Sequence, residues 1–244
     1  MNQVITIPSV SMDHARQAEY ELAYQSSSDP WDYASSFDQV RFATIADVAK
    51  RWCPAPENSL EVACGLGYQS RLLAEFAETH WAYDYAPSAV QQTRLRCSDL
   101  QHKVNVDVRD ALNPGYPDNF FDLIVMADIA MDENDDWWLQ VLTKAKISLR
   151  KNGIMVVSGR IKEPSRREFE NRFALLGMSV KERIYFHDRY WFKFRSLVKR
   201  VFPKNLSTRI LSSSTTLGGL RAIGRLQGVN GSIHFGVVAQ VGGE

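Results

Sequence analysis

A short strand that runs directly into two glycines constrains the fold of this chain more than any other feature. Residues 60–64 are apolar apart from Glu61, and Gly65 and Gly67 follow before a segment of helical character at 69–76. Glycine has no Cβ, so it permits a tight turn and a close approach of the backbone to a ligand. The pattern therefore predicts a strand that turns over two glycines into a helix.

Two further carboxylates end the apolar segments that follow. Asp84 closes the next predicted strand, at the spacing from Glu61 that places an acid at the tip of the neighbouring parallel strand, where it can hold a ribose diol. Asp110 follows the third strand and could accept from the exocyclic amine of adenine, with Ala111 and Leu112 covering the ring. Two structural alternatives stay open: Asp110 as a helix N-cap, and Glu61 as an acceptor for backbone amides of the turn.

Strands and helices alternate along most of the chain, which predicts an α/β fold with a parallel, doubly wound sheet. The apolar run at 121–127 is typical of a central strand that is buried on both faces. The expected strands are 60–64, 80–84, 103–108, 121–127, 154–158, 179–186 and 232–241, and the expected helices are 11–24, 37–52, 68–77, 87–97, 136–149 and 165–176. We divide the chain into an N-terminal helical cover (1–56), a Rossmann-like core (57–188), a basic, partly helical insertion (189–231) and a final core strand (232–244).

The composition is that of an ordinary globular protein. The 244 residues are 45% hydrophobic and 23% charged, which suits one α/β domain with a sizeable core. The sequence shows no apolar run of membrane-spanning length and no secretory signal at its start, and the three cysteines lack metal-ligand spacing. These features predict a cytoplasmic location, reduced cysteines and no metal site.

Positive charge is concentrated near the C-terminus. The net charge is +1, yet the segment from Arg189 onward holds nine Lys or Arg and a single acid, Glu244. Apolar residues at helical spacing from Trp191 to Val201, with cations between them, predict a basic amphipathic helix. It could pack against the core, form a lid over the substrate or contact an anionic membrane through 189–225. We expect residues 212–219 to form a mobile loop.

Residues 60–158 resemble the class I S-adenosylmethionine-dependent methyltransferases. The first motif of that family is acid-x-G-x-G-x-G, and this chain reads Glu61-Val-Ala63-Cys-Gly65-Leu-Gly67, so Ala63 replaces the first glycine. The resemblance implies an enzyme with S-adenosylmethionine as cofactor and a mostly parallel, seven-stranded Rossmann-like sheet whose last strand is antiparallel. The cofactor-binding residues that it implies are Glu61, Ala63, Gly65, Gly67, Asp84, Tyr85, Asp110, Ala111 and Ala127.

A narrower resemblance concerns the N-terminal segment. Asp29-Pro-Trp-Asp-Tyr33, a helix with Phe37 and Arg41, and the helix end at Thr93–Arg96 are similar to the nodulation-type N-methyltransferases, which methylate amino sugars or oligosaccharides. That family usually follows its fourth strand with Ser-Glu and paired tyrosines, whereas this chain reads Ala127-Asp128-Ile-Ala-Met-Asp132. The resemblance implies a small-molecule acceptor, with the amino group of a sugar or sugar-derived metabolite as the expected target.

The candidate acceptor residues surround the end of the fourth strand. Asp128 is the candidate orienting base, and His187 could contribute to catalysis, although a surface histidine is the alternative reading. Candidate substrate-binding residues are Tyr190, Trp31 and Tyr33, the last two being alternatively core aromatics of the cover.

Other functions remain open at the level of sequence. The acceptor could instead be a hydroxyl, a lipid head group or a nucleic acid that meets the basic segment, the last being the least expected. A nicotinamide-dependent Rossmann oxidoreductase is disfavoured because Ser70 stands where a dinucleotide motif has its third glycine. The remaining alternative is a protein that binds S-adenosylmethionine without catalysis.

Overall fold

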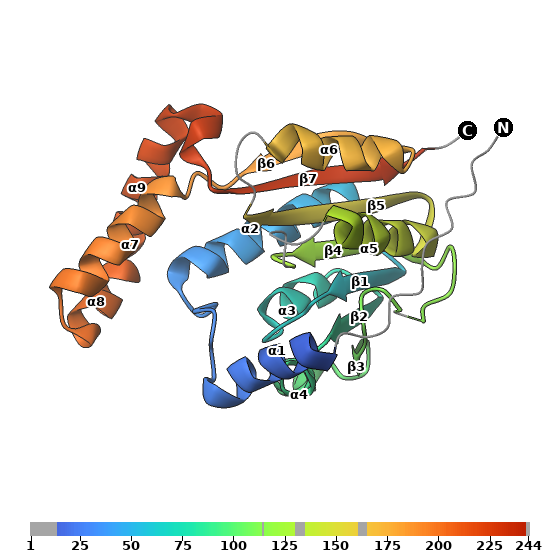
Figure 1. Ribbon diagram of the computed structural model, residues 1–244, viewed down its shortest axis with the longest axis horizontal. Coiled ribbons are helices and arrows are strands. Elements are labelled where there is room, and N and C mark those ends of the chain that lie inside the picture. Colours follow the sequence, from blue (N-terminus) through green and yellow to red (C-terminus); the bar gives the residue numbers. More distant parts are fainter. Residues whose placement is uncertain (1–13, 114, 130–134, 161–164, 243–244) are drawn as a thin grey trace.

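A single seven-stranded sheet organises the protein, as the computed structural model shows (Figure 1). The structure describes residues 14–113, 115–129, 135–160 and 165–242. The strand order is β3-β2-β1-β4-β5-β7-β6, with β7 antiparallel to both of its neighbours. The strands are β1 (Asn58–Val62), β2 (Thr79–Asp84), β3 (Val104–Val108), β4 (Phe121–Ala127), β5 (Leu149–Arg160), β6 (Met178–Tyr185) and β7 (His234–Val241). This arrangement confirms the predicted fold class.

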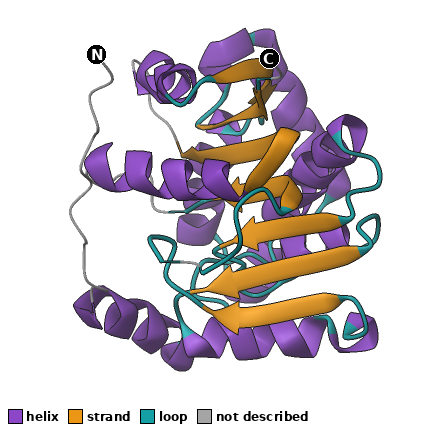
Figure 2. Cartoon of the chain, turned by 90° about the vertical axis from the view of Figure 1, so that its right-hand side faces the viewer, coloured by secondary structure: helices purple, strands orange, loops and turns teal. Residues whose placement is uncertain are grey.

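Helices cover both faces of the sheet (Figure 2). The α-helices are α1 (His14–Ser26), α2 (Ser36–Trp52), α3 (Tyr68–Ala74), α4 (Pro87–Arg96), α5 (Asp135–Ser148), α6 (Ser165–Leu175), α7 (Arg189–Val201), α8 (Lys204–Leu211) and α9 (Ser214–Leu226), with short 3₁₀ turns at Ser98–Leu100 (η1) and Gly228–Gly231 (η2). Among the described helices, none is long and apolar enough to cross a bilayer.

The central strand β4 contributes side chains to two hydrophobic core clusters. Ile124 and Met126 belong to the cluster that also contains side chains of α5 and α6. Leu123 and Val125 belong to the cluster formed with α2, α3 and the helices α7 to α9. Alternate residues of a strand point to opposite faces, so an uninterrupted apolar sequence is needed where both faces are covered.

The C-terminal insertion is more helical than expected. The predicted loop at 212–219 is wrong, because α9 begins at Ser214, with the Ser213 hydroxyl accepting from the Thr216 amide. Leu217 of this helix is buried in the core cluster that includes α2. A composition of Ser, Thr and Gly indicated a loop, whereas the N-cap and the burial of one apolar face stabilise a helix.

Candidate active site

The glycine turn lies at the carboxyl end of β1 and packs closely on α4. Gly65 and Gly67 both have left-handed backbones, with φ of 53° and 74°. A Cβ at Gly67 would lie 2.9 Å from the Cα of Thr93, and the Thr93 hydroxyl donates to the Gly65 carbonyl over 2.9 Å. Ala63, which stands at the family's first glycine position, also has a positive φ of 61°. The turn therefore keeps the glycine-like geometry even where the side chain is a methyl group.

Asp84 ends β2 beside this turn, as predicted. One of its carboxylate oxygens accepts from the Gly65 amide over 2.9 Å, and the other accepts from the Ala86 amide over 3.0 Å. Burial raises the pKa of Asp84, and these amides partly oppose that shift. A carboxylate has about four acceptor positions, so the side chain can still accept from a hydroxyl of a ribose.

Glu61 lies beneath the turn in a fully buried position. The hydroxyl of Ser70 donates to its carboxylate, and His80 Nε2 lies 3.9 Å from the same oxygen. Burial raises the pKa of Glu61 to about 8; the bond from Ser70 opposes this shift, and the nearby Asp84 carboxylate adds to it. The structural alternative had backbone amides of the turn as the donors to Glu61. Among the described residues, the donor to Glu61 is the side chain of Ser70.

Asp110 lies beyond the end of β3 in a tight turn. Its carboxylate accepts from the Leu112 amide over 2.9 Å, and the residue forms an isolated bridge with Asn113. The structure assigns no helix immediately after it among the described residues, so the helix N-cap alternative is wrong. A shallow pocket opens beside it, lined by Asp107, Val108, Arg109, Asp110 and Asn113. Ala111 is partly buried against the core.

Aromatic residues of the cover lie over the glycine turn. A Cβ at Gly65 would lie 3.2 Å from the Tyr24 hydroxyl and 3.4 Å from the Tyr33 ring. Burial, together with the Asp128 carboxylate, raises the pKa of Tyr33 well above its ordinary value. Trp31 is 44% exposed, with its ring 6.1 Å from that of Tyr20. Tyr33 thus faces the turn, whereas Trp31 lies at the surface.

Two more predicted residues lie at the ends of strands around this turn. The carbonyl of Tyr85, just after β2, accepts from the Gln17 side chain over 2.9 Å, which ties α1 to the sheet. Ala127, the last residue of β4, is partly buried against the core cluster that includes α2.

Asp128 directly follows β4 and has a left-handed backbone with a φ of 56°. Its amide donates to the Ser158 carbonyl over 2.9 Å. One carboxylate oxygen forms an ion pair with Arg41, a buried residue of α2 whose other nitrogens donate to Asp38 over 3.2 and 2.8 Å. The second oxygen of Asp128 is buried and has no hydrogen-bond partner among the described residues. An unsatisfied buried acceptor calls for a donor from a ligand or from water.

A histidine that the sequence analysis missed lies next to that oxygen. His234, the first residue of β7, has its Nδ1 2.5 Å from a carboxylate oxygen of Asp188 and its Nε2 3.8 Å from Asp128. Asp188 is fully buried and also accepts from the amides of Ile233 and His234. An Asp–His pair of this kind fixes the orientation of the ring and leaves Nε2 facing the site.

His187 and Tyr190 occupy other surroundings. The His187 amide donates to the Ser232 hydroxyl over 2.8 Å, and the residue packs on Gly224 of α9. Burial lowers the pKa of His187, and the nearby Arg225 lowers it further. The ring centroid of Tyr190 lies 5.9 Å from the Lys193 ammonium. Among the described residues, no ion pair or hydrogen bond joins either residue to Asp128.

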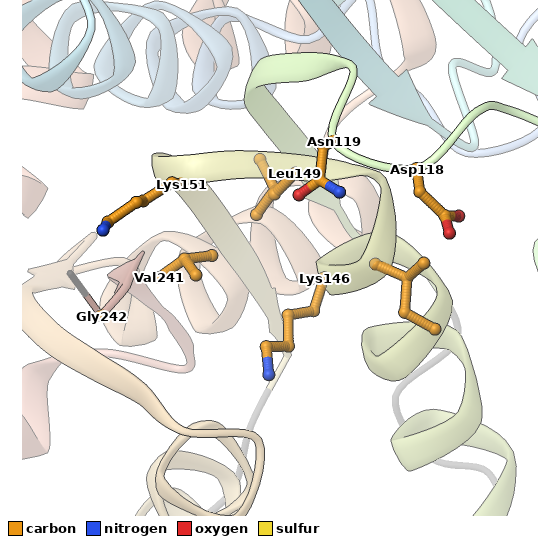
Figure 3. A pocket seen from close by; sticks show the side chains of 8 residues that line it. Asp118, Asn119, Lys146, Leu149, Lys151, Val241 and Gly242 are labelled. Carbon is orange, nitrogen blue, oxygen red and sulfur yellow. The ribbon is translucent and has the colours of Figure 1, made fainter. Parts of the chain in front are cut away.

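A separate pocket lies at the other end of the strands, where β4 and β5 begin and β7 ends (Figure 3). It is lined by the start of β5, the end of α5 and the end of β7, and Lys146 and Lys151 are among its side chains. It contains none of the predicted site residues. The described part of the chain also holds no group of three His, Cys, Asp or Glu arranged to bind a metal.

The model of the methyltransferase domain family matches residues 60–153, which contain the glycine turn, Asp84, Asp110 and Asp128. The chain contains a class I S-adenosylmethionine-dependent methyltransferase domain. Nodulation protein S of Bradyrhizobium diazoefficiens is 33% identical over 114 residues, which cover 46% of this chain and 51% of the relative. The chain thus matches about half the length of this curated relative.

Solved structures with the same fold extend over most of the chain. The N-methyltransferase NodS of Bradyrhizobium japonicum, in complex with S-adenosylhomocysteine, has a TM-score of 0.61 at 17% identity and covers 93% of this chain and 98% of its own. The [4+2]-cyclase SpnF has a TM-score of 0.59 at 15% identity and covers 82% of both chains. At these identities the likeness establishes the methyltransferase fold, and the cyclase shows that this fold also supports other chemistry.

The site of the methyltransferase domain fits S-adenosylmethionine, the methyl donor of this family. Asp84 offers carboxylate lone pairs beside the turn, where a ribose would lie. The pocket at Asp110 has a carboxylate acceptor that could bind the amine of an adenine. The unsatisfied oxygen of Asp128 lies at the end of β4, the strand beside β1, and is an acceptor available to a ligand.

Proposed function

We propose that this protein transfers a methyl group from S-adenosylmethionine to an amino group of a small molecule, with a sugar or a sugar-derived metabolite as the expected acceptor. The methyltransferase domain supports the reaction type. The similarity to nodulation protein S over part of the chain and to the fold of an N-methyltransferase supports nitrogen as the acceptor atom.

The arrangement of Asp128 and His234 is the observation that carries this proposal. The unsatisfied oxygen of Asp128 and Nε2 of His234 are 3.8 Å apart, so one nitrogen can donate to both at ordinary hydrogen-bond distances. A primary amine has at least two N–H groups for this purpose, whereas a hydroxyl has one. The pair therefore favours an amine over a hydroxyl.

The residues divide the work of the reaction among them. S-adenosylmethionine supplies an electrophilic methyl carbon bonded to a sulfonium sulfur. An acceptor bound in its ammonium form would be oriented by Asp128, which Arg41 holds, and His234 Nε2 would accept one of its three N–H protons. This proton transfer leaves a neutral amine whose lone pair can attack the methyl carbon that bound S-adenosylmethionine would supply, with the sulfonium sulfur as the leaving group. Asp188 stabilises the positive charge that His234 gains.

The structural role of Ser70 argues further against the oxidoreductase alternative. Its hydroxyl bonds to the buried Glu61 and so has a structural role at the position where a dinucleotide-binding turn needs a third glycine. A titration with nicotinamide and flavin cofactors on one side and S-adenosylhomocysteine on the other separates the two classes. Binding of a nicotinamide cofactor alone would contradict the proposal.

A methyl-transfer screen tests the proposed function directly. The full chain is incubated with S-adenosylmethionine and, in parallel, amino sugars, nucleotide sugars and phospholipids, and products are identified by mass. We expect the gain of one methyl group on an amine-bearing sugar. Transfer to a hydroxyl would overturn the assignment of the acceptor, and binding of S-adenosylhomocysteine without any transfer would indicate a non-catalytic protein.

Substitutions at the acceptor end test the assigned residues. We expect Asp128→Asn and His234→Gln each to lower kcat by about 100-fold or more, because each removes a group that orients or deprotonates the amine. The affinity for S-adenosylhomocysteine, measured by calorimetry, should stay within about twofold of the wild type.

Variants of two other histidines serve as a control and as a test of the rival proton acceptor. His102→Gln, at an exposed position, is the matched control and should retain full turnover. His187→Gln decides between the two candidate histidines: a large loss of kcat in this variant with none in His234→Gln would assign the proton acceptor to His187 instead.

A further inference from the structure

The C-terminal arm, which we define as residues 189–231, is unusually basic. It contains nine Lys or Arg and no Asp or Glu. Arg195 and Lys199 pair with Asp32 of the cover. The other seven cations have no carboxylate partner within the part of the chain that the structure describes. Most of this positive charge is therefore directed to solvent or to a partner.

Helix α7 of the arm has two different faces. Trp191 and Val198 are buried in the core cluster that includes α2. Leu197 and Val201, one helical turn apart, are 58% and 59% exposed. Phe202, which follows α7, and Leu206 of α8 are also exposed, at 40% and 44%. Lys193, Arg200 and Lys204 are exposed at three- or four-residue spacing from Leu197 and Val201.

The arm projects beyond the sheet on the side where β4 and β5 end (Figure 1). Asp128, which follows β4, and His234, which begins β7, lie at the same end of the sheet, where β4 ends and the antiparallel β7 begins. A surface bound by the arm would therefore lie on the side of the molecule that holds the candidate active site.

We propose that the arm binds the surface of an anionic lipid bilayer. The apolar patch of Leu197, Val201, Phe202 and Leu206 enters the boundary between head groups and acyl chains, while the surrounding cations contact lipid phosphates. Charge complementarity favours this occupant over a symmetric contact with a second copy, because that contact would bring two acid-free, basic surfaces together. Membrane contact through this segment does not depend on the proposed reaction.

Vesicle sedimentation with the full chain tests the proposal. We expect binding to vesicles of phosphatidylcholine with phosphatidylglycerol, weak or no binding to phosphatidylcholine alone, and a loss of binding as salt is raised. The double variant Leu197→Glu with Val201→Glu should bind at least about tenfold more weakly, because it replaces apolar contact with like-charge repulsion.

The control is Leu175→Glu on α6, where the leucine is 76% exposed but lies outside the arm. This variant should bind vesicles as the wild type does. Circular dichroism and S-adenosylhomocysteine binding report whether each variant is folded and keeps its cofactor site, independently of any methyl transfer. A lack of preference for anionic vesicles, or unchanged binding of the double variant, would overturn the proposal. Self-association in light scattering that the double variant abolishes, without vesicle binding, would assign the patch to a protein interface instead.

Discussion

Several residues of the site adopt conformations or charge environments that an isolated residue avoids. Ala63 and Asp128 have left-handed backbones, which cost about 1–2 kcal/mol for a residue with a Cβ. Glu61 is a carboxyl group buried beneath the glycine turn. Such features persist where the surrounding structure holds them in place, and they concentrate at functional sites.

The pKa of Glu61 leads to a prediction about pH. The folded protein holds a proton on this group up to about pH 8, whereas the unfolded chain releases it near the ordinary value of 4.5. Between these values the folded state binds more protons, so this group stabilises the protein below pH 4.5 and that contribution is lost as the pH rises toward 8. Glu61→Gln cannot ionise and removes this dependence.

We therefore expect the free energy of unfolding of Glu61→Gln, relative to wild type, to rise by about 1.4 kcal/mol per pH unit within this window. Urea unfolding at a series of pH values measures it. His80, whose pKa burial lowers to about 3, has the opposite pH dependence, but it is present in both proteins and is largely removed by taking the difference. A difference that does not change with pH would show that Glu61 is ionised in the folded state.

At the scale of elements, the glycine turn joins β1 to α3 and holds α3 against α4. The Gly67 position combines a positive φ with a close contact to the Thr93 backbone. The close contact comes from helix packing, whereas the positive φ comes from the turn itself. These two effects can be distinguished because Gly177 also has a positive φ, of 68°, but nothing lies within 4 Å of the position that a Cβ would take there.

We expect Gly177→Ala to reduce the free energy of unfolding by about 1–2 kcal/mol through backbone strain alone. Gly67→Ala should cost at least about 1 kcal/mol more, because α4 must also move away from the new methyl group. Urea unfolding measures both losses, and calorimetry should show weaker S-adenosylhomocysteine binding only for Gly67→Ala. Equal losses of stability would mean that α4 adjusts without cost.

Across the whole molecule, the N-terminal cover and the C-terminal arm contact each other. Asp32 pairs with Arg195 and Lys199 of α7, and the ring of Phe37 stacks on Trp191 at 5.6 Å. Arg41, Asp188 and His234 also come from outside residues 60–153. Apart from Asp128, the residues of the proposed acceptor end thus come from segments that flank the matched domain.

The contact at Asp32 can be tested by hydrogen exchange. We expect Asp32→Asn to change the free energy of unfolding by less than about 1 kcal/mol, because the pair is partly exposed, and to speed amide exchange in α7 severalfold. Asparagine tolerates the positive φ of this position as aspartate does. Asp99→Asn, which breaks the ion pair with Arg71 on α3, is the matched control and should leave α7 unchanged. Unaltered exchange in both variants would show that the stacked rings hold the arm without the ion pairs.

Local sequence patterns predicted the alternation of strands and helices from residue 60 to residue 186 and the residues of the proposed cofactor end of the site. The reason is physical: Glu61, Gly65 and Asp84 act through local geometry, since each lies at the end of a strand and the spacing along the chain reports its place. The contact of Asp188 and His234 with Asp128 and Arg41 came from the tertiary structure alone, because the four residues lie in separate segments and no local pattern marks Asp188 or His234. The same holds for α9, whose helix depends on the burial of Leu217 against residues distant in the sequence.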